Sequence, residues 1–197
     1  MTLDMFAVVF GGAQALLPVY ARDILQVGEV GYGILAASLN AGALLMSIVM
    51  VLMPTVQRTG RVLLLSVGAF GVATIAFGAS RSFPLSVAAY MAVGMADQVS
   101  VVLRQTTIQL ATPDYLRGRV TAVGQLFIGT SNQLGAMESG FVAAATSATF
   151  AVVSGGIGCL AVLALVAARM PELRRYTIRH VIETARRDEA AHEATGG

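Results

Sequence analysis

Hydrophobic residues are gathered into six long stretches, and short polar connections separate each stretch from the next. About 20 residues of helix cross a bilayer core about 30 Å thick, and the six stretches reach or approach that length. They do not alternate between polar and apolar residues as barrel strands do. The pattern predicts an all-α membrane protein with six transmembrane helices, at about residues 3–21, 30–53, 62–80, 84–111, 120–145 and 147–168.

Arginine is distributed unevenly between the two sets of alternate connections. One set holds only Arg22 and Arg81. The other set, together with the C-terminal segment, holds Arg58, Arg61, Arg117, Arg119, Arg169, Arg174, Arg175, Arg179, Arg186 and Arg187. Because short cytoplasmic loops of multi-pass proteins carry the excess of basic residues, we expect both termini in the cytoplasm. Residues 171–197 then form a cytoplasmic tail, either an amphipathic helix followed by disordered residues or a solvated tail throughout.

The composition agrees with a membrane location and argues against several other classes. Hydrophobic residues make up 56% of the 197 residues and charged residues only 12%, with a mean hydropathy of +0.73. Soluble domains carry about 25% charged residues. The formal net charge of +2 is too small to indicate nucleic-acid binding. The single cysteine, Cys159, lies in an apolar stretch, so neither an internal disulfide nor a paired-cysteine metal site can form.

Strongly polar side chains occur in four of the six predicted helices. The first, second, fourth and fifth contain amides or charges, whereas the third and sixth contain only serine and threonine as polar residues. Polar groups within a membrane face a bundle interior or a watery path. We therefore expect the first, second, fourth and fifth predicted helices to line an interior, and the third and sixth to lie outside. The candidate proton or substrate residues are Gln14, Asn40, Asp97, Gln98, Asn132 and Gln133 near one depth, with Glu138 farther out and Arg104 toward the cytoplasm.

Two stripes of polar residues run along the fourth and fifth predicted helices. Tyr90, Asp97 and Arg104 are spaced by seven and share one face, so Asp97 and Arg104 lie about 10 Å apart along the axis. The second stripe consists of Gln125, Asn132 and Ser139. Two interpretations stay open: these groups line a cavity, or they hydrogen-bond between helices and stabilise the bundle. Asp97 is the best candidate for binding a proton or a substrate, because an intramembrane carboxylate is the costliest of these groups.

Glycine is frequent in the fifth and sixth predicted helices. Small residues let helix backbones approach closely in membranes, so we expect close helix contacts there, with a gating hinge as the alternative. The glycines concerned are Gly124, Gly129, Gly135, Gly140, Gly155, Gly156 and Gly158.

Enzymatic motifs are missing from the sequence. Residues Gly94-Met95-Ala96-Asp97 resemble part of an intramembrane aspartyl protease motif, but that chemistry needs a carboxylate pair and no second aspartate lies at this depth. Both histidines, His180 and His192, lie in the C-terminal segment, which leaves no base for an intramembrane serine protease. Nucleotide-binding and zinc-protease motifs are also lacking. We therefore expect no enzyme activity, no cofactor and no metal.

Several short segments resemble one superfamily of membrane transporters. Residues Gln57-Arg58-Thr59-Gly60-Arg61 resemble the Asp-Arg-x-Gly-Arg core of the cytoplasmic loop motif of the major facilitator superfamily, with glutamine in place of aspartate. Further segments resemble bacterial permeases related to enterobactin exporters: Leu3–Phe6, Phe10–Ala13, Thr112–Val120, Ser131–Gly135 and Glu138–Gly140. The resemblance implies cytoplasmic gate loops that contain Arg58, Gly60, Arg61, Arg117, Gly118 and Arg119.

The resemblance also implies a fold and a function. The fold is the C-terminal half of a major facilitator transporter, whose six helices form two inverted three-helix repeats. The function is export of a small organic molecule, of drug or siderophore type, across the bacterial inner membrane by proton-coupled alternating access. Alternating access moves two halves around a midplane site. The expected partners are therefore the lipid bilayer, an N-terminal half or a second copy, and the substrate, but no nucleic acid. The alternative is a truncated membrane remnant or scaffold that does not transport.

Overall fold

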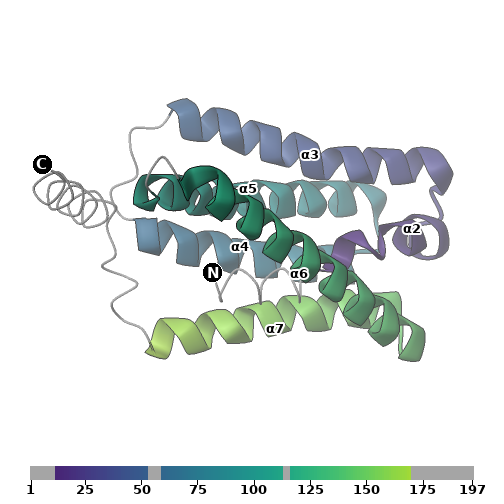
Figure 1. The fold of residues 1–197 in the computed structure, drawn as a ribbon. Helices are drawn as coiled ribbons and strands as arrows, with labels where there is room; N and C mark the ends of the chain where they lie inside the picture. Colours follow the sequence, from purple (N-terminus) through teal and green to yellow (C-terminus); the bar gives the residue numbers. More distant parts are fainter. Residues whose placement is uncertain (1–11, 53–58, 113–115, 170–197) are drawn as a thin grey trace, which may run out of the picture.

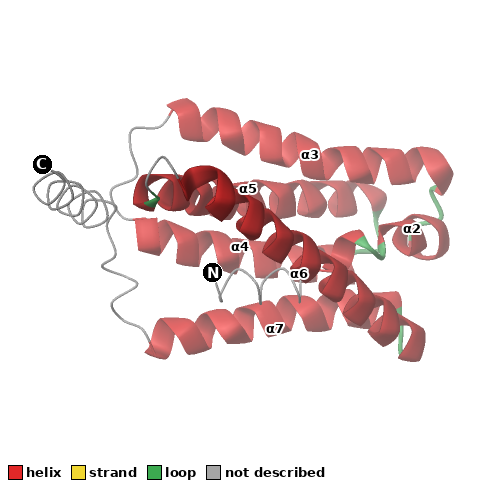
Figure 2. Ribbon diagram, in the orientation of Figure 1, coloured by secondary structure: helices red, strands yellow, loops and turns green. Residues whose placement is uncertain are grey.

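The computed structural model describes residues 12–52, 59–112 and 116–169. Within these ranges the secondary structure is helical and no strand occurs (Figure 2). The motif residues at 3–6, the gate residue Arg58 and the tail at 171–197 lie outside the described residues, and what the sequence indicates about them stays a prediction.

Five long helices alternate in direction, so that each begins at the end of the molecule where the preceding one finishes (Figure 1). Consecutive helices are antiparallel because the connections between them are short. Such connections are short because a polar backbone inside lipid must be hydrogen-bonded within a helix. The helices are α3 (Gly28–Leu52), α4 (Thr59–Ala79), α5 (Phe83–Ala111), α6 (Arg117–Ala145) and α7 (Ala148–Arg169).

Four of these helices are long and apolar enough to cross a membrane. The crossing segments are Gly28–Leu52, Val62–Ala79, Phe83–Thr106 and Ala148–Arg169. Helix α6 has 29 residues, as many as α5, but its amides and its carboxylate make it less apolar. The predicted first helix lies partly outside the described residues. The described part of the chain therefore has four candidate spans where the sequence predicts six, and it is a multi-pass membrane protein.

The segment that precedes α3 changes its helical geometry twice. It consists of a 3-10 turn η1 (Gly12–Gln14), one α-helical turn α2 (Leu17–Val19) and a π-helical turn η2 (Tyr20–Ile24). Pro18 has no backbone N–H and cannot bond to the carbonyl of Gln14, which interrupts a regular α-helix here. The Leu25 N–H then bonds to the Tyr20 carbonyl at 2.8 Å, five residues back. The apolar pattern predicts a helix over 3–21 but does not reveal this irregularity.

The long helices form a row with α6 lying across it. Helix α3 packs on α5, α5 on α4 and α4 on α7, whereas α6 packs mainly on α7 and η1 (Figure 1). Of the two helices that the sequence places outside the polar ones, α7 lies at the end of the row. Helix α4 instead lies inside the row, between α5 and α7.

Helices α3 and α5 cross at a pair of glycines. A Cβ atom added to Gly42 would overlap the carbonyl oxygen of Met91, and one added to Gly94 would overlap the carbonyl oxygen of Leu39. The contact is reciprocal and involves backbone on both sides, so neither helix can accept a side chain here without moving away. These two glycines fix the closest approach between α3 and α5.

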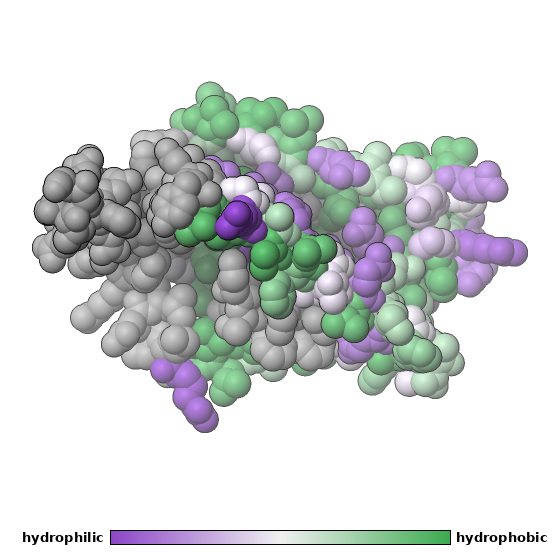
Figure 3. All heavy atoms as spheres, viewed as in Figure 1, coloured by the Kyte–Doolittle hydropathy of each residue, from purple (hydrophilic) through white to green (hydrophobic). Residues whose placement is uncertain are grey.

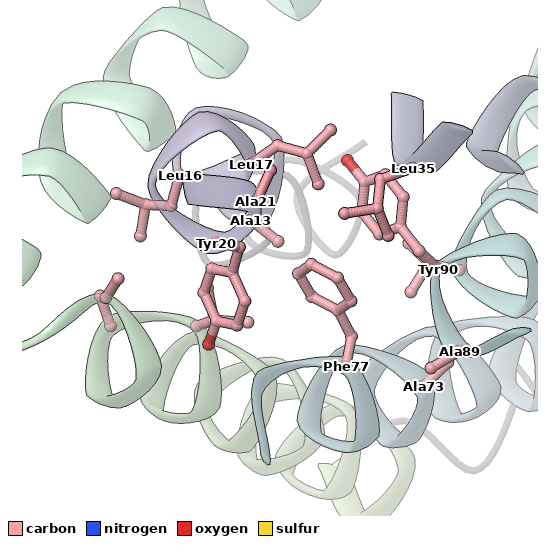
Figure 4. Close-up of a cluster of buried hydrophobic side chains, with 14 residues drawn as sticks. Ala13, Leu16, Leu17, Tyr20, Ala21, Leu35, Ala73, Phe77, Ala89 and Tyr90 are labelled. Carbon is pink, nitrogen blue, oxygen red and sulfur yellow. The ribbon is translucent and has the colours of Figure 1, made fainter. Parts of the chain in front are cut away.

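An aromatic cluster joins the irregular segment to the row. The ring centroids of Tyr20 and Phe77 lie 4.8 Å apart, and those of Phe77 and Tyr90 also lie 4.8 Å apart (Figure 4). The Tyr20 hydroxyl donates a hydrogen bond of 2.9 Å to the carbonyl oxygen of Gly78. Aromatic pairs in this geometry stabilise a core beyond their buried area, and the buried tyrosine hydroxyl is satisfied. The cluster therefore anchors η2 against α4 and α5.

Candidate functional site

Helix α6 has one face that packs and one that no described helix covers. Ser131, Gly135 and Ser139 are buried, and all three lie in the C-terminal half of the helix. None of the residues from 118 to 130 is fully buried. Helix α6 therefore packs on its neighbours through its C-terminal half, and most of its length lies against no described helix.

The uncovered face of α6 carries a shallow, open groove of about 760 Å³. The lining residues recur at three- and four-residue intervals, which places them on one side of the helix. They include two carboxamides and one hydroxyl, and none of them is charged. The groove is lined by Ala122, Gln125, Leu126, Gly129, Thr130 and Gln133. Figure 3 shows that polar and apolar side chains are interspersed on the face of the molecule that α6 crosses.

The exposed surface of α4 offers a contrast. From Val62 to Ala79 its exposed residues recur at helical spacing and contain no amide or charge, as expected for a lipid-facing strip. They are Leu65, Ala69, Val72, Ala76 and Ala79. Both surfaces are uncovered in the structure, but only that of α6 carries groups that need hydrogen-bond partners. The amides of α6 are therefore poorly suited to hydrocarbon. The exposed surface of the helix is mixed, since it also carries large apolar side chains: Val123, Leu126, Phe127, Leu134, Met137 and Phe141.

The second predicted stripe is exposed along most of its length and buried only at its C-terminal end. Gln125 and Asn132 are exposed, whereas Ser139 is only 6% exposed because it lies where the helix packs on its neighbours. Glu138 is half-buried and follows Gln133 by five residues, which places it about 140° around the helix. The structure therefore separates Glu138 from the groove, although both belong to the same predicted wall.

Asp97 lies where one face of α5 changes from buried to exposed. The same face is buried at Tyr90, which is 2% exposed within the aromatic cluster, but it is exposed at Asp97 two turns farther along. Gln98 and Arg104 are half-buried. The carboxylate thus stands just beyond the packed core, accessible from the side of α5 that the cluster covers nearer its N-terminus.

The remaining candidates are exposed on other elements, Asn40 on α3 and Gln14 on η1, which packs on α6. Asn40 is exposed about 140° around α3 from buried Leu35, and its amide nitrogen donates to the carbonyl oxygen of Ala36 at 3.2 Å. Gln14 is exposed in η1. Among the hydrogen bonds between described residues, none joins Gln14, Asn40, Asp97, Asn132 or Gln133 to another member of this set. The polar groups that the sequence places near one depth therefore do not form one bonded cluster.

The described residues also contain no group of three or more histidine, cysteine or acidic residues that could hold a metal ion. Cys159 is 1% exposed inside α7, where its thiol lies 4.0 Å from the carbonyl oxygen of Val67. The Cys159 side chain therefore packs on the side of α7 that faces α4.

A comparison with protein families decides the broad class. The family model described as transmembrane secretion effector matches residues 3–188, which include all the described helices. The chain belongs to the transmembrane secretion effector family. This is a family of major facilitator transporters, so the superfamily resemblance in the sequence is confirmed. No curated protein and no solved structure matches the chain significantly.

The candidate gate residues of this transmembrane secretion effector gather at one end of the molecule. The N-termini of α4 and α6 and the C-terminus of α7 all lie at that end (Figure 1). Gly60 is buried near the start of α4, whereas Gly118 and Arg119 are exposed in the first turn of α6. Arg61 and Arg117 belong to the same helix ends. Arg22 and Arg81 are exposed at the opposite end.

Two features of this secretion effector are difficult to find in its sequence. The groove exists because most of α6 is not packed against a described helix. The spacing of residues along the sequence does not predict this lack of packing. The signal that exists is the eight-residue interval from Gln125 to Gln133, which places the two amides within about 80° of each other around a helix. The irregular segment before α3 had a weaker signal in Pro18 and the glycine pair Gly11-Gly12.

Proposed function

We propose that this transmembrane secretion effector is the C-terminal half of a secondary active transporter in the bacterial inner membrane. It exports a small organic molecule, of drug or siderophore type, by proton-coupled alternating access. The observation that carries the proposal is the amide-bearing face of α6, which no described helix covers. Amides facing hydrocarbon would lose their hydrogen bonds with water, so this face needs water, a polar partner or a substrate.

In this proposal the uncovered face of α6 forms one wall of a translocation path. Alternating access requires a second wall on the other side of a midplane site. An N-terminal half or a second copy of the chain supplies that wall, and the six helices of this chain form two inverted repeats. The chain moves its substrate without chemical change, so it needs no catalytic residue and no cofactor.

Asp97 is the proton-binding residue of the proposal. It is the carboxylate of α5, it is exposed, and it lies immediately beyond the packed aromatic core. Glu138 is the second carboxylate, half-buried on α6 and turned away from the groove. The position of Asp97 on an open helix face supports its exchange of protons with water, whereas the surroundings of Glu138 favour a contact within the bundle.

The proposal is tested by the reactivity of introduced cysteines in native membranes. A charged methanethiosulfonate reagent modifies thiols in water but not thiols that face hydrocarbon. We expect Gln133→Cys on α6 to react at least roughly tenfold faster than Val72→Cys, which is 59% exposed on the apolar strip of α4. The native Cys159 is 1% exposed and contributes little background. Equal, slow reaction at both positions would show that α6 faces lipid and would remove the proposed path.

A further inference from the structure

The groove on α6 combines hydrogen-bonding groups with a complete lack of charge. Gln125, Gln133 and Thr130 supply donors and acceptors, and Leu126, which is 71% exposed, supplies apolar surface. Each carboxamide offers two donors and two acceptor positions. Neither Gln125 nor Gln133 makes a hydrogen bond to another described residue. Both amides are therefore available to a molecule that enters the groove.

The arrangement of the amides leaves space between them. Gln125 and Gln133 are eight residues apart, which corresponds to about 12 Å along the helix axis. Gly129 lies midway, and a Cβ atom added there would meet nothing within 4 Å. Ala122 adds a second small residue to the lining. The groove thus offers an apolar floor with an amide toward each end.

Charge distinguishes the ligands that suit such a surface. Once the proposed second wall covers the groove, a cation or anion inside it would lose hydration without meeting an opposite charge on this face of α6, which is unfavourable. The nearest charge before the groove on α6 is that of Arg119, three residues before Ala122 and six before Gln125, and therefore about 9 Å along the axis from the nearer amide. Arg119 is exposed in the first turn of the helix, where a long side chain can extend to the aqueous interface.

We infer that the groove formed by Ala122, Gln125, Leu126, Gly129, Thr130 and Gln133 is a subsite for an uncharged, hydrogen-bonding organic molecule with an apolar body. The inference rests on the proposed function and narrows its substrate class. Gln125 and Gln133 hydrogen-bond the polar groups of the ligand, while Leu126 contacts its apolar part. The same amides would not compensate the charge of a cationic or anionic ligand of similar size.

A set of three probes with one fluorophore tests the inference. Dansylamide is uncharged at neutral pH, dansylcadaverine is cationic and dansylglycine is anionic. Binding to the full chain in lipid nanodiscs is measured by dansyl fluorescence, with empty nanodiscs subtracted. We expect dansylamide to bind most tightly, and Gln133→Leu or Gln125→Leu to weaken its binding several-fold, since a hydrogen bond contributes about 1 kcal/mol. Equal binding of all three probes, or tightest binding of dansylglycine, would overturn the inference.

A charge substitution provides the sharper arm of the experiment. Gln133→Glu should shift the preference from dansylamide toward dansylcadaverine by roughly tenfold or more, because the new carboxylate attracts the cation. Gln125→Glu is a second variant with the same expectation, in case the first fails to fold. Gln26→Glu is the matched control, since Gln26 is exposed far from the groove, before α3, and should leave the preference unchanged.

The two proposals fail in different ways. If Gln133→Cys reacts with the aqueous reagent but neither glutamate variant changes the probe preference, the path stands and the subsite is wrong. If Gln133→Cys does not react and the glutamate variants also have no effect, both proposals are wrong. A changed preference in Gln26→Glu as well would show that net charge, not the groove, decides probe binding.

Discussion

Spacing along the chain predicts which residues share a helix face but not which faces are covered. Tyr90 and Asp97 share a face of α5, as the seven-residue interval indicates, yet Tyr90 is buried and Asp97 is exposed. The difference arises because the ring of Phe77, which is stacked on Tyr20, covers that face at Tyr90 only. Likewise Ser139 is buried although Asn132, one heptad earlier, is exposed. The sequence predicts which residues share a helix face. Whether a residue on that face is buried depends on where the neighbouring helices end.

Asp97 allows a direct test at the scale of one residue. Replacing the carboxyl with an amide in Asp97→Asn keeps the size but removes the ability to bind and release a proton. We expect pH-gradient-driven accumulation of dansylamide by the chain assembled with its partner half in proteoliposomes to fall at least roughly tenfold, as typical when a proton-transfer group is lost. Asp97→Glu should retain much of the accumulation because it restores a carboxyl. Unchanged accumulation in Asp97→Asn would remove Asp97 from the coupling mechanism.

At the scale of helices, glycine frequency identifies a close contact of α7 but not the tightest contact among the described helices. The sequence predicts close contacts in α6 and α7, but Gly124, Gly129 and Gly140 of α6 would accept a Cβ atom with nothing within 4 Å. Gly156 of α7 does pack closely, against the backbone of Gly71 in α4. The tightest approach among the described helices is instead between α3 and α5, where Gly42 faces the backbone of Met91 and Gly94 faces that of Leu39. Whether a position needs glycine depends on how closely the facing helix approaches it. A single sequence does not show which helix faces a given position.

The crossing of α3 and α5 predicts opposite outcomes for the same substitution at two sites. Gly94→Ala places a methyl group against the carbonyl of Leu39, and backbone cannot rotate away as a side chain can. We expect it to destabilise the protein by about 1–3 kcal/mol, the usual cost of overpacking, and to lower the Tm of the detergent-solubilised chain. Gly33→Ala on α3 is the control, because a Cβ atom there meets nothing within 4 Å. Its Tm should stay the same or rise, since alanine favours helix. Equal Tm changes in the two variants would contradict the close crossing.

At the scale of the whole molecule, the apolar pattern predicts an all-helical membrane protein, and this is confirmed. The motifs predict the major facilitator superfamily, and the family match confirms it. The pattern overstates the regularity of the first segment, because hydropathy does not register the missing N–H of Pro18 or the π-helical turn at Tyr20. It also does not distinguish α6 as a helix that lies across the others. Such features depend on how the elements pack against one another, and the hydropathy of a segment carries no information about that packing.

The separation of arginines between the two ends of the bundle predicts its orientation in the membrane. Arg119 and Arg169 are exposed at the end of the molecule where α7 finishes. Arg81 is exposed at the other end, in the connection between α4 and α5. Because basic residues are retained in the cytoplasm during insertion, we expect the first end to face inward. Single cysteines at Arg81→Cys and Arg169→Cys, in a Cys159→Ala background, can be labelled with a membrane-impermeant maleimide. Arg81→Cys should react in intact cells, and Arg169→Cys only after the membrane is permeabilised. The reverse pattern would mean that the arginine-rich end is external, and the gate residues at the starts of α4 and α6 would then lie on the wrong side for a cytoplasmic gate.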